Sequence, residues 1–238
     1  MPKKLQIVRF NEVTSPITSA VTKFGGRPVW VGMPQWPISP ALGTPMRFIC
    51  QIRLEPTVFG GTGDRLAYVF YTEGVDKEGR YVCGGAVGDR ESAVIVQPGG
   101  ITHPNTQPLL EGPSLYRVVA QAGKDRLTEQ PAEYEVELEE GDDPEFATEG
   151  TRHGWDALPP GPGWSEERKK QYEQAVRGNK IGGTPAFLSN DELPTGGPWH
   201  LLLQLEGTPF EINFGDAGAG FVLVDHDLQQ GLYFSQSC

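Results

Sequence analysis

The sequence has 238 residues and is acidic, with 31 Asp and Glu against 20 Lys and Arg and a formal net charge of −11 at pH 7. This charge, without a basic stripe, excludes nucleic acid as a partner, because phosphate recognition depends on Lys and Arg. The length corresponds to one or two domains, and 31 Gly with 21 Pro predict short strands joined by tight turns.

The N-terminal stretch "MPKKLQIVRF" is not a secretory signal, because its partly apolar run is only six residues long and no small-residue cleavage site follows it. No stretch approaches the roughly 18 consecutive apolar residues of a membrane-spanning helix. The three cysteines, Cys50, Cys83 and Cys238, are odd in number and form no CxxC pair, which indicates reduced thiols. We expect a cytoplasmic protein without a membrane partner.

Two similar stretches, "KFGGRP" at residues 23–28 and "KIGGTP" at residues 180–185, open two series of matching landmarks. In each series an apolar run containing one glutamine follows, at Gln51 and Gln204, and then a Gly-Asp pair with Asp64 and Asp216. Landmarks that recur in one order, with changes of offset in turn-like sequence, predict a duplicated supersecondary unit. We place the first unit at about 20–75 and the second at about 180–238, related by a pseudo-twofold axis.

The repeated residues each allow two interpretations. Paired glycines before a proline are typical of a turn with positive φ or close backbone approach, although their amides could also bind an anion. Gln51 and Gln204 either bond to the backbone of a neighbouring loop or contact a ligand between the halves. Asp64 and Asp216 either form Gly-Asp turns or act as a symmetric acid/base pair.

Taken together, the K-x-G-G-x-P stretches, the apolar strands ending near a glutamine and the later stretch "GDAGAGFVLV" resemble the YwqG-like family, a family of domains of unknown function. The resemblance covers most of the chain and is clearest from Lys180 onward. It implies an internally duplicated α+β fold of mostly antiparallel strands. Because it brings no established activity, it assigns no catalytic residues.

The region of about 90–164, which we expect to connect the units, is locally acidic: residues 129–149 hold ten acidic residues and no Lys or Arg. Within it "EYEVELE" alternates strictly, which predicts a strand with Glu133, Glu135, Glu137 and Glu139 on one face. This face is either a solvated edge strand that discourages aggregation or a docking surface for a basic protein.

A Pro- and Gly-rich loop at residues 152–164, pinned by Trp155 and Trp164, leads into the one clear helix, at residues 165–178. Ser165 is its expected N-cap, two glutamates occupy its first turn, and Gly178 ends it.

Motifs for chemistry are scarce. The histidines His103, His153, His200 and His226 are scattered without metal-ligand spacing, and no GxSxG elbow occurs. "VDHD" at residues 224–227 is a hairpin turn or, alternatively, a metal site built on Asp225 and Asp227. We therefore predict no metal, no cofactor and no catalytic residues.

From the sequence we expect one α+β domain over residues 1–238, mostly antiparallel, made of two duplicated β-rich units with few helices. We hypothesise a non-catalytic binding protein, for example an immunity-type or regulatory protein, whose Glu133, Glu135, Glu137 and Glu139 engage a basic protein. The alternative is a small-molecule binding protein or enzyme with a pocket between the halves, bordered by Gln51, Gln204, Asp64 and Asp216.

Overall fold

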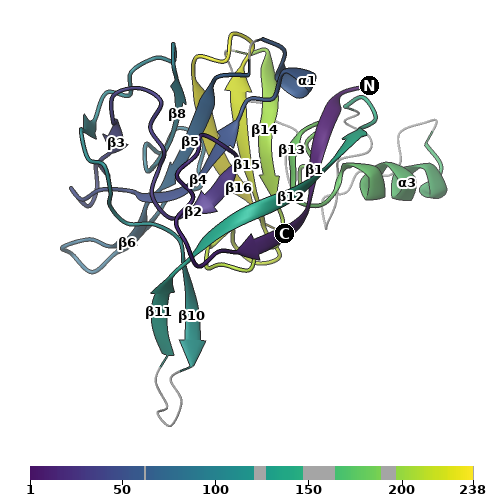
Figure 1. Cartoon of the computed structure of the whole chain (residues 1–238). Helices are drawn as coiled ribbons and strands as arrows, with labels where there is room; N and C mark the ends of the chain where they lie inside the picture. The colour runs from purple at the N-terminus through teal and green to yellow at the C-terminus, as the bar shows by residue number, and fades with distance from the viewer. Residues whose placement is uncertain (62, 121–126, 147–163, 189–196, 238) are drawn as a thin grey trace.

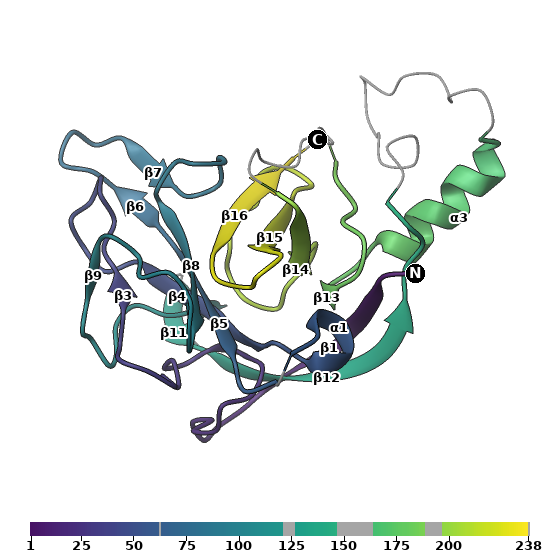
Figure 2. The same cartoon turned by 90° about the horizontal axis from the view of Figure 1, so that it is seen from above.

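Ten strands of the computed structural model close into one antiparallel barrel (Figure 1). The structure describes residues 1–61, 63–120, 127–146, 164–188 and 197–237. Around the barrel the order is β1 (Lys3–Glu12), β12 (Glu133–Asp142), β2 (Lys23–Gly25), β4 (Arg47–Arg53), β5 (Leu66–Tyr71), β8 (Ser92–Gln97), β16 (Gly231–Gln236), β15 (Ala219–Asp225), β14 (Trp199–Leu205) and β13 (Lys180–Gly182). Seen from above, the long β1–β12 pair joins the group of β4, β5 and β8 to the group of β14, β15 and β16 (Figure 2).

The expected fold class, an α+β fold of two duplicated units related by a pseudo-twofold axis, is wrong. In the described part of the chain the helices are only α1 (Pro56–Phe59) and α3 (Glu166–Val176), and ten of the strands form one closed barrel. The error arose in the region of 90–164, which is no connector because it contributes β8 and β12 to the barrel wall. β12 pairs with β1 over its whole length and with β2 at its start, and this closes the sheet.

Several barrel strands are apolar on both faces because both faces are covered. In β5, Ala67, Val69 and Tyr71 belong to the core inside the barrel, whereas Tyr68 and Phe70 belong to an outer cluster with Trp36. In β15 the alternation is the same, and its outer residues pack with Phe187. Burial of each such large side chain contributes roughly 1.5–3 kcal/mol, which explains why these runs lack polar residues.

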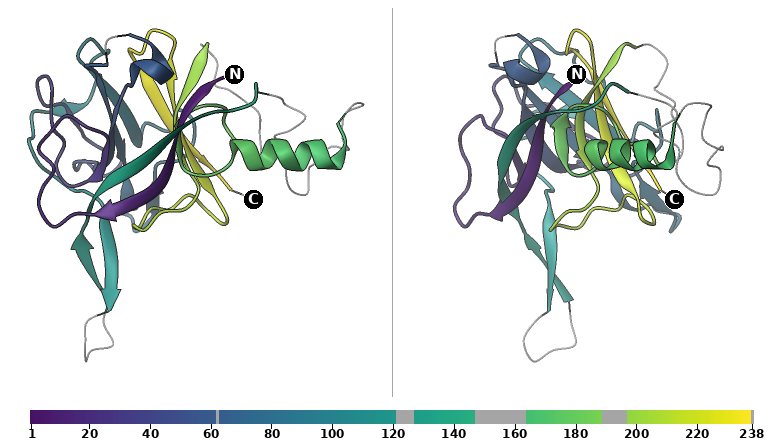
Figure 3. Two further views of the ribbon diagram at one scale, coloured as in Figure 1. Left: turned by 45° about the vertical axis from the view of Figure 1, so that its right-hand side comes forward. Right: turned by 90° about the vertical axis from the view of Figure 1, so that its right-hand side faces the viewer.

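The described residues also form three two-stranded sheets outside the barrel. They are β3 (Trp36–Pro37) with β9 (Thr106–Gln107), β6 (Glu73–Val75) with β7 (Tyr81–Cys83), and β10 (Tyr116–Ala120) with β11 (Leu127–Pro131). The β10–β11 pair projects away from the barrel in every side view (Figures 1 and 3).

The helix predicted at residues 165–178 is confirmed as α3, which lies beside the barrel (Figure 3). The Ser165 side chain accepts a hydrogen bond from the Arg168 amide at 3.2 Å, as expected for an N-cap. Tyr172 and Val176 are buried, and the Trp164 ring packs edge-on against Tyr172. Trp155 and residues 152–163 of the predicted loop lie outside the described residues. Neither described helix has the length and apolar character needed to cross a bilayer.

Candidate functional site

Each of the two K-x-G-G-x-P stretches begins with a fully buried lysine. Its partner is a carboxylate of β12's first residue, Glu133, or of the residue just after the strand, Asp143. Lys180 Nζ donates to Asp143 Oδ2 at 2.5 Å and to the carbonyl oxygens of Val176 and Thr184 at 2.5 and 2.6 Å. Lys4 Nζ lies 2.6 Å from Asp143 Oδ1. Burial lowers the pKa of Lys180 to about 8, opposed by the charge of Asp143.

The other lysine, Lys23, is held in a similar way at the opposite end of β12. Its Nζ lies 2.5 Å from Glu133 Oε1 and 3.1 Å from the carbonyl oxygen of Ile17. Glu133 Oε1 also accepts a hydrogen bond from the Ile17 amide at 3.2 Å. Buried charges are retained when they are paired and hydrogen-bonded, so both lysines anchor the fold.

The turns after these lysines require glycine, as the sequence predicted. Gly26 and Gly183 have φ values of 66° and 78°. A Cβ atom at either position would overlap a carboxylate, that of Glu133 beside Gly26 and that of Asp143 beside Gly183. The paired glycines therefore let the backbone approach the buried ion pairs.

The predicted ligand amides are bonded to the backbone. Gln51 Oε1 accepts from the Val29 amide at 2.8 Å, and its Nε2 donates to the Val21 carbonyl at 2.8 Å. Gln204 Oε1 accepts from the Ala186 amide at 2.8 Å. These amides are those of the residues that follow Pro28 and Pro185, so each glutamine fixes the exit of a Gly-Gly turn.

Asp64 and Asp216 are both exposed. Three cavities of the described part of the chain lie beside Val58, Phe214 and Trp30, and none of them is lined by the four predicted residues, Gln51, Gln204, Asp64 and Asp216. The role of these residues as ligand contacts stays a prediction.

The predicted glutamate face of β12 divides into one half-buried glutamate, Glu133, and three exposed ones. Glu133 belongs to the Lys23 ion pair, whereas Glu135, Glu137 and Glu139 alternate outward with the half-buried Val136 and Leu138. On the adjacent β1, Arg9 Nε lies 4.0 Å from Glu137. Three exposed carboxylates remain in a row along one strand.

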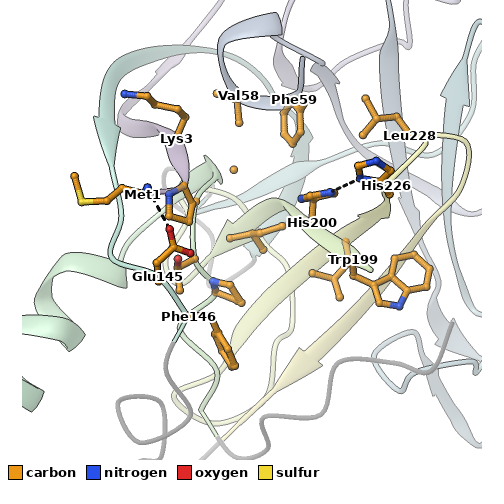
Figure 4. Close-up of a pocket in the computed structure, with 17 residues that line it drawn as sticks. Met1, Lys3, Val58, Phe59, Glu145, Phe146, Trp199, His200, His226 and Leu228 are labelled. Carbon is orange, nitrogen blue, oxygen red and sulfur yellow. Dashed lines mark hydrogen bonds and ion pairs between the residues drawn. The ribbon is translucent and has the colours of Figure 1, made fainter. Parts of the chain in front are cut away.

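A cavity of about 590 Å³ opens beside the start of β1 (Figure 4). Its apolar walls come from α1, β14, β15 and the segment after β12, and include Val58, Phe59, Phe146, Leu201, Leu223 and Leu228. Its polar lining includes Lys3, Glu145, Thr184, His200 and His226. Concave, mainly apolar pockets with a few convergent polar groups are the usual form of small-molecule sites.

Two histidines that appear scattered in the sequence meet on one wall of this cavity. His200 Nε2 lies 3.3 Å from His226 Nδ1, within hydrogen-bond distance, and Figure 4 shows the two rings side by side. Partial burial, with the adjacent His226, lowers the pKa of His200. The register of the β14–β15 hairpin explains the contact: His200 pairs with Val224, and His226 is the next residue on the same face of that strand's extension.

The "VDHD" segment forms the β15–β16 turn. Asp225 Oδ1 accepts from the amides of Gln229 and Gln230 at 2.7 and 3.2 Å. Arg65 donates to the carbonyl oxygens of Asp227 and Leu228 and ties the turn to the start of β5. The carboxylate of Asp225 thus serves the turn, and the described residues contain no group of three or more His, Cys, Asp or Glu able to hold a metal ion.

The remaining reactive side chains do not extend this site. Cys50 is buried, which raises the pKa of its thiol, and Cys83 Sγ lies 2.8 Å from the Tyr71 hydroxyl. Lys180, with its lowered pKa, is fully buried and saturated by three acceptors. The accessible chemistry of the cavity is therefore that of the imidazole pair, which can donate, accept and take up a proton.

Comparison with known proteins identifies a family. The chain matches no curated protein and no solved structure. A family model described as a domain of unknown function, DUF1963, matches residues 22–237, and the chain belongs to that family.

Proposed function

We propose that the protein is a non-catalytic binding protein, of an immunity or regulatory type, that engages a basic protein through Glu135, Glu137 and Glu139. The observation that carries this proposal is their outward position on one strand. Glu135 and Glu139 form no ion pair with another described residue, and Glu137 has only the 4.0 Å contact with Arg9. Exposed carboxylates in a row attract and orient a positively charged partner.

The alternative explanation, protection of a sheet edge, fits the position of Glu135 less well. Glu135 lies between two neighbouring strands, because it pairs with Asn11 of β1 and with Lys23 of β2. There the strand is paired on both sides and needs no charge to block further pairing, whereas the part of β12 with Glu137 and Glu139 pairs with β1 alone among the described strands. Binding of a partner explains the charge at this position better.

The test compares two variants with equal changes in net charge. In the first, Glu135, Glu137 and Glu139 are replaced by Gln. In the control, the exposed Asp64, Asp216 and Glu211 are replaced by Asn, Asn and Gln. The wild-type protein first captures a basic protein at low ionic strength. That partner is then purified and titrated against the wild type and both variants.

We expect the first variant to lose affinity and to show a weaker salt dependence, with the control unchanged. If both variants lose the same affinity for the basic protein, the effect depends on net charge alone, and the proposed surface is wrong.

Small-molecule binding is a second candidate function, favoured by the cavity of about 590 Å³ with the His200–His226 pair on its wall. This cavity replaces the predicted pocket bordered by Gln51 and Gln204 as the place where a ligand would lie.

Two finer assignments accompany these proposals. Within the DUF1963 family we infer a closer relationship to YwqG-like proteins, supported by the two K-x-G-G-x-P stretches and by "GDAGAGFVLV". We also propose a cytoplasmic location, supported by Cys50 and Cys83, which are both free thiols.

A further inference from the structure

The cavity beside β14 has walls suited to an apolar molecule. Val58 and Phe59 of α1 lie on one side, as Figure 4 shows, and Leu201 and Leu223 come from two adjacent barrel strands. A volume of about 590 Å³ falls within the range of small-molecule sites. The body of a ligand that fits these walls is therefore an aliphatic chain or an aromatic ring.

Most polar groups of the cavity already have partners. Lys3 Nζ lies 2.8 Å from Asp142, and Glu145 lies 3.2 Å from the amino group of Met1. The Thr184 hydroxyl donates to the Pro144 carbonyl at 2.5 Å. In contrast, His200 Nδ1 and His226 Nε2 have no hydrogen-bond partner among the described residues, so the imidazole pair is the group left to meet a ligand.

The hydrogen-bonding groups that the imidazole pair presents to the cavity depend on whether the pair is neutral or has taken up one proton. When both rings are neutral they share one proton between His200 Nε2 and His226 Nδ1, and the two outer nitrogens present one N–H donor and one lone pair. After uptake of one proton both outer nitrogens are N–H donors, and the pair carries a positive charge. An anion is therefore recognised best by the protonated pair.

The other charges near the pair do not replace this role. Lys3 and Asp142 neutralise each other, Glu145 faces the Met1 amino group, and α1 carries no charged residue. In the turn itself, Asp225 is bonded to backbone amides, Asp227 is exposed, and Arg65 donates to backbone carbonyls. The wall is also pre-formed, since the buried Leu228 is held at a φ of 55°, a conformation that L residues adopt only when their surroundings impose it.

From this arrangement we propose that the cavity binds a small carboxylic acid with an apolar body, and that the His200–His226 pair takes up a proton as the carboxylate binds. The proposal rests on the second candidate function, small-molecule binding. It adds the ligand's chemical class and a coupling of affinity to pH.

The experiment uses probes matched in carbon skeleton, of which one carries a carboxylate and the other a neutral hydroxyl: octanoate with 1-octanol, and phenylacetate with 2-phenylethanol. Each is titrated calorimetrically into the full chain at about pH 6 and about pH 8, on either side of the ordinary range of histidine. The same titrations use a double variant, His200→Asn with His226→Asn. Both histidine side chains are exposed. A cooperative thermal unfolding transition serves as the control that the double variant is folded.

For the wild type we expect acids to bind about tenfold more tightly at the lower pH, because one proton is taken up with the ligand, whereas the alcohols bind equally at both. The double variant should bind acids and alcohols without pH dependence. Long-range ¹H–¹⁵N spectra of the imidazoles, assigned with single variants, should show protonation of the pair on addition of octanoate.

The outcomes distinguish small-molecule binding itself from the binding of a carboxylate with uptake of a proton. Acids and alcohols that bind with the same affinity at both pH values would overturn the carboxylate and proton coupling but leave small-molecule binding standing. Failure of all four probes to bind at millimolar concentration would overturn both. A pH dependence that persists in the double variant would place the proton uptake elsewhere and overturn the role of the histidines.

Discussion

Lys180 and Asp143 form an ion pair in which both side chains are fully buried, with 2.5 Å between Nζ and Oδ2. The carboxylate also contacts Lys4 Nζ and accepts from the Thr184 amide, so one acid organises β13, β1 and the Gly-Gly turn. Lys23 and Glu133 repeat the arrangement beside β2. These two buried pairs hold the ends of β12 in the barrel wall.

Removal of the Asp143 carboxylate should be strongly destabilising, whereas removal of its neighbour should not. Asp143→Ala leaves the Lys180 ammonium buried without a counter-ion, which costs about 3–5 kcal/mol. Asp142→Ala disrupts only an exposed pair with Lys3, worth about 0–1 kcal/mol. Urea unfolding of both variants measures the difference. If both variants lose a similar free energy of unfolding, the buried pair contributes no more to stability than the exposed pair.

The lowered pKa of Lys180 predicts a pH dependence of stability. In the unfolded chain this lysine titrates near 10.5, and burial lowers the pKa to about 8 in the folded protein. Between these values the unfolded chain binds the proton and the folded protein does not, so the free energy of unfolding rises with pH, by up to about 3 kcal/mol over the whole window.

The measurement is the free energy of unfolding between about pH 8 and about pH 9.5, below the range where tyrosines of ordinary pKa ionise. The wild type should gain stability relative to Lys180→Gln, which cannot titrate. Parallel curves for the two proteins would contradict the assignment of the lowered pKa to Lys180.

The glycines beside the buried carboxylates should tolerate alanine less well than other glycines with positive φ. Gly26→Ala and Gly183→Ala introduce a Cβ against the carboxylates of Glu133 and Asp143. Gly79 has a φ of 81°, yet a Cβ there would meet nothing within 4 Å. Gly79→Ala should therefore cost about 1 kcal/mol, the strain of the backbone alone, and the other two clearly more. Thermal unfolding of the three variants ranks them, and an equal cost would argue that the carboxylates move aside.

Local features of the fold were predictable from sequence because they depend on neighbouring residues. Ser165 before two glutamates predicts the start of α3, and the Gly-Gly pairs before proline predict turns with positive φ; the structure shows both. "EYEVELE" predicts an alternating strand, which forms the first part of β12. Each of these inferences rests on a spacing of a few residues.

The closure of the barrel was not predictable in the same way, because strand pairing joins residues distant in the sequence. Leu5 pairs with Glu140 and Ile181, and Val94 pairs with Gly231 as well as with Val69. Apolar runs such as "LAYVFY" reveal that a strand is buried but not which strand lies beside it. For the same reason His200 and His226 seemed unrelated until the register of the β14–β15 hairpin placed them together.

The buried glutamines offer a last prediction, which separates a structural role from a role in binding. Gln51→Met leaves the Val29 amide and the Val21 carbonyl without their side-chain partner, and Gln204→Met does the same to the Ala186 amide. An unpaired buried group costs about 1–3 kcal/mol. Ala186 is buried, whereas Val29 is half-buried and Val21 exposed, so both variants should lose stability in urea unfolding and Gln204→Met should lose more. Hydrogen exchange should become faster at the amides of Val29 and Ala186. A variant that retains its stability and slow exchange, yet loses affinity for a ligand, would instead make that glutamine a ligand contact.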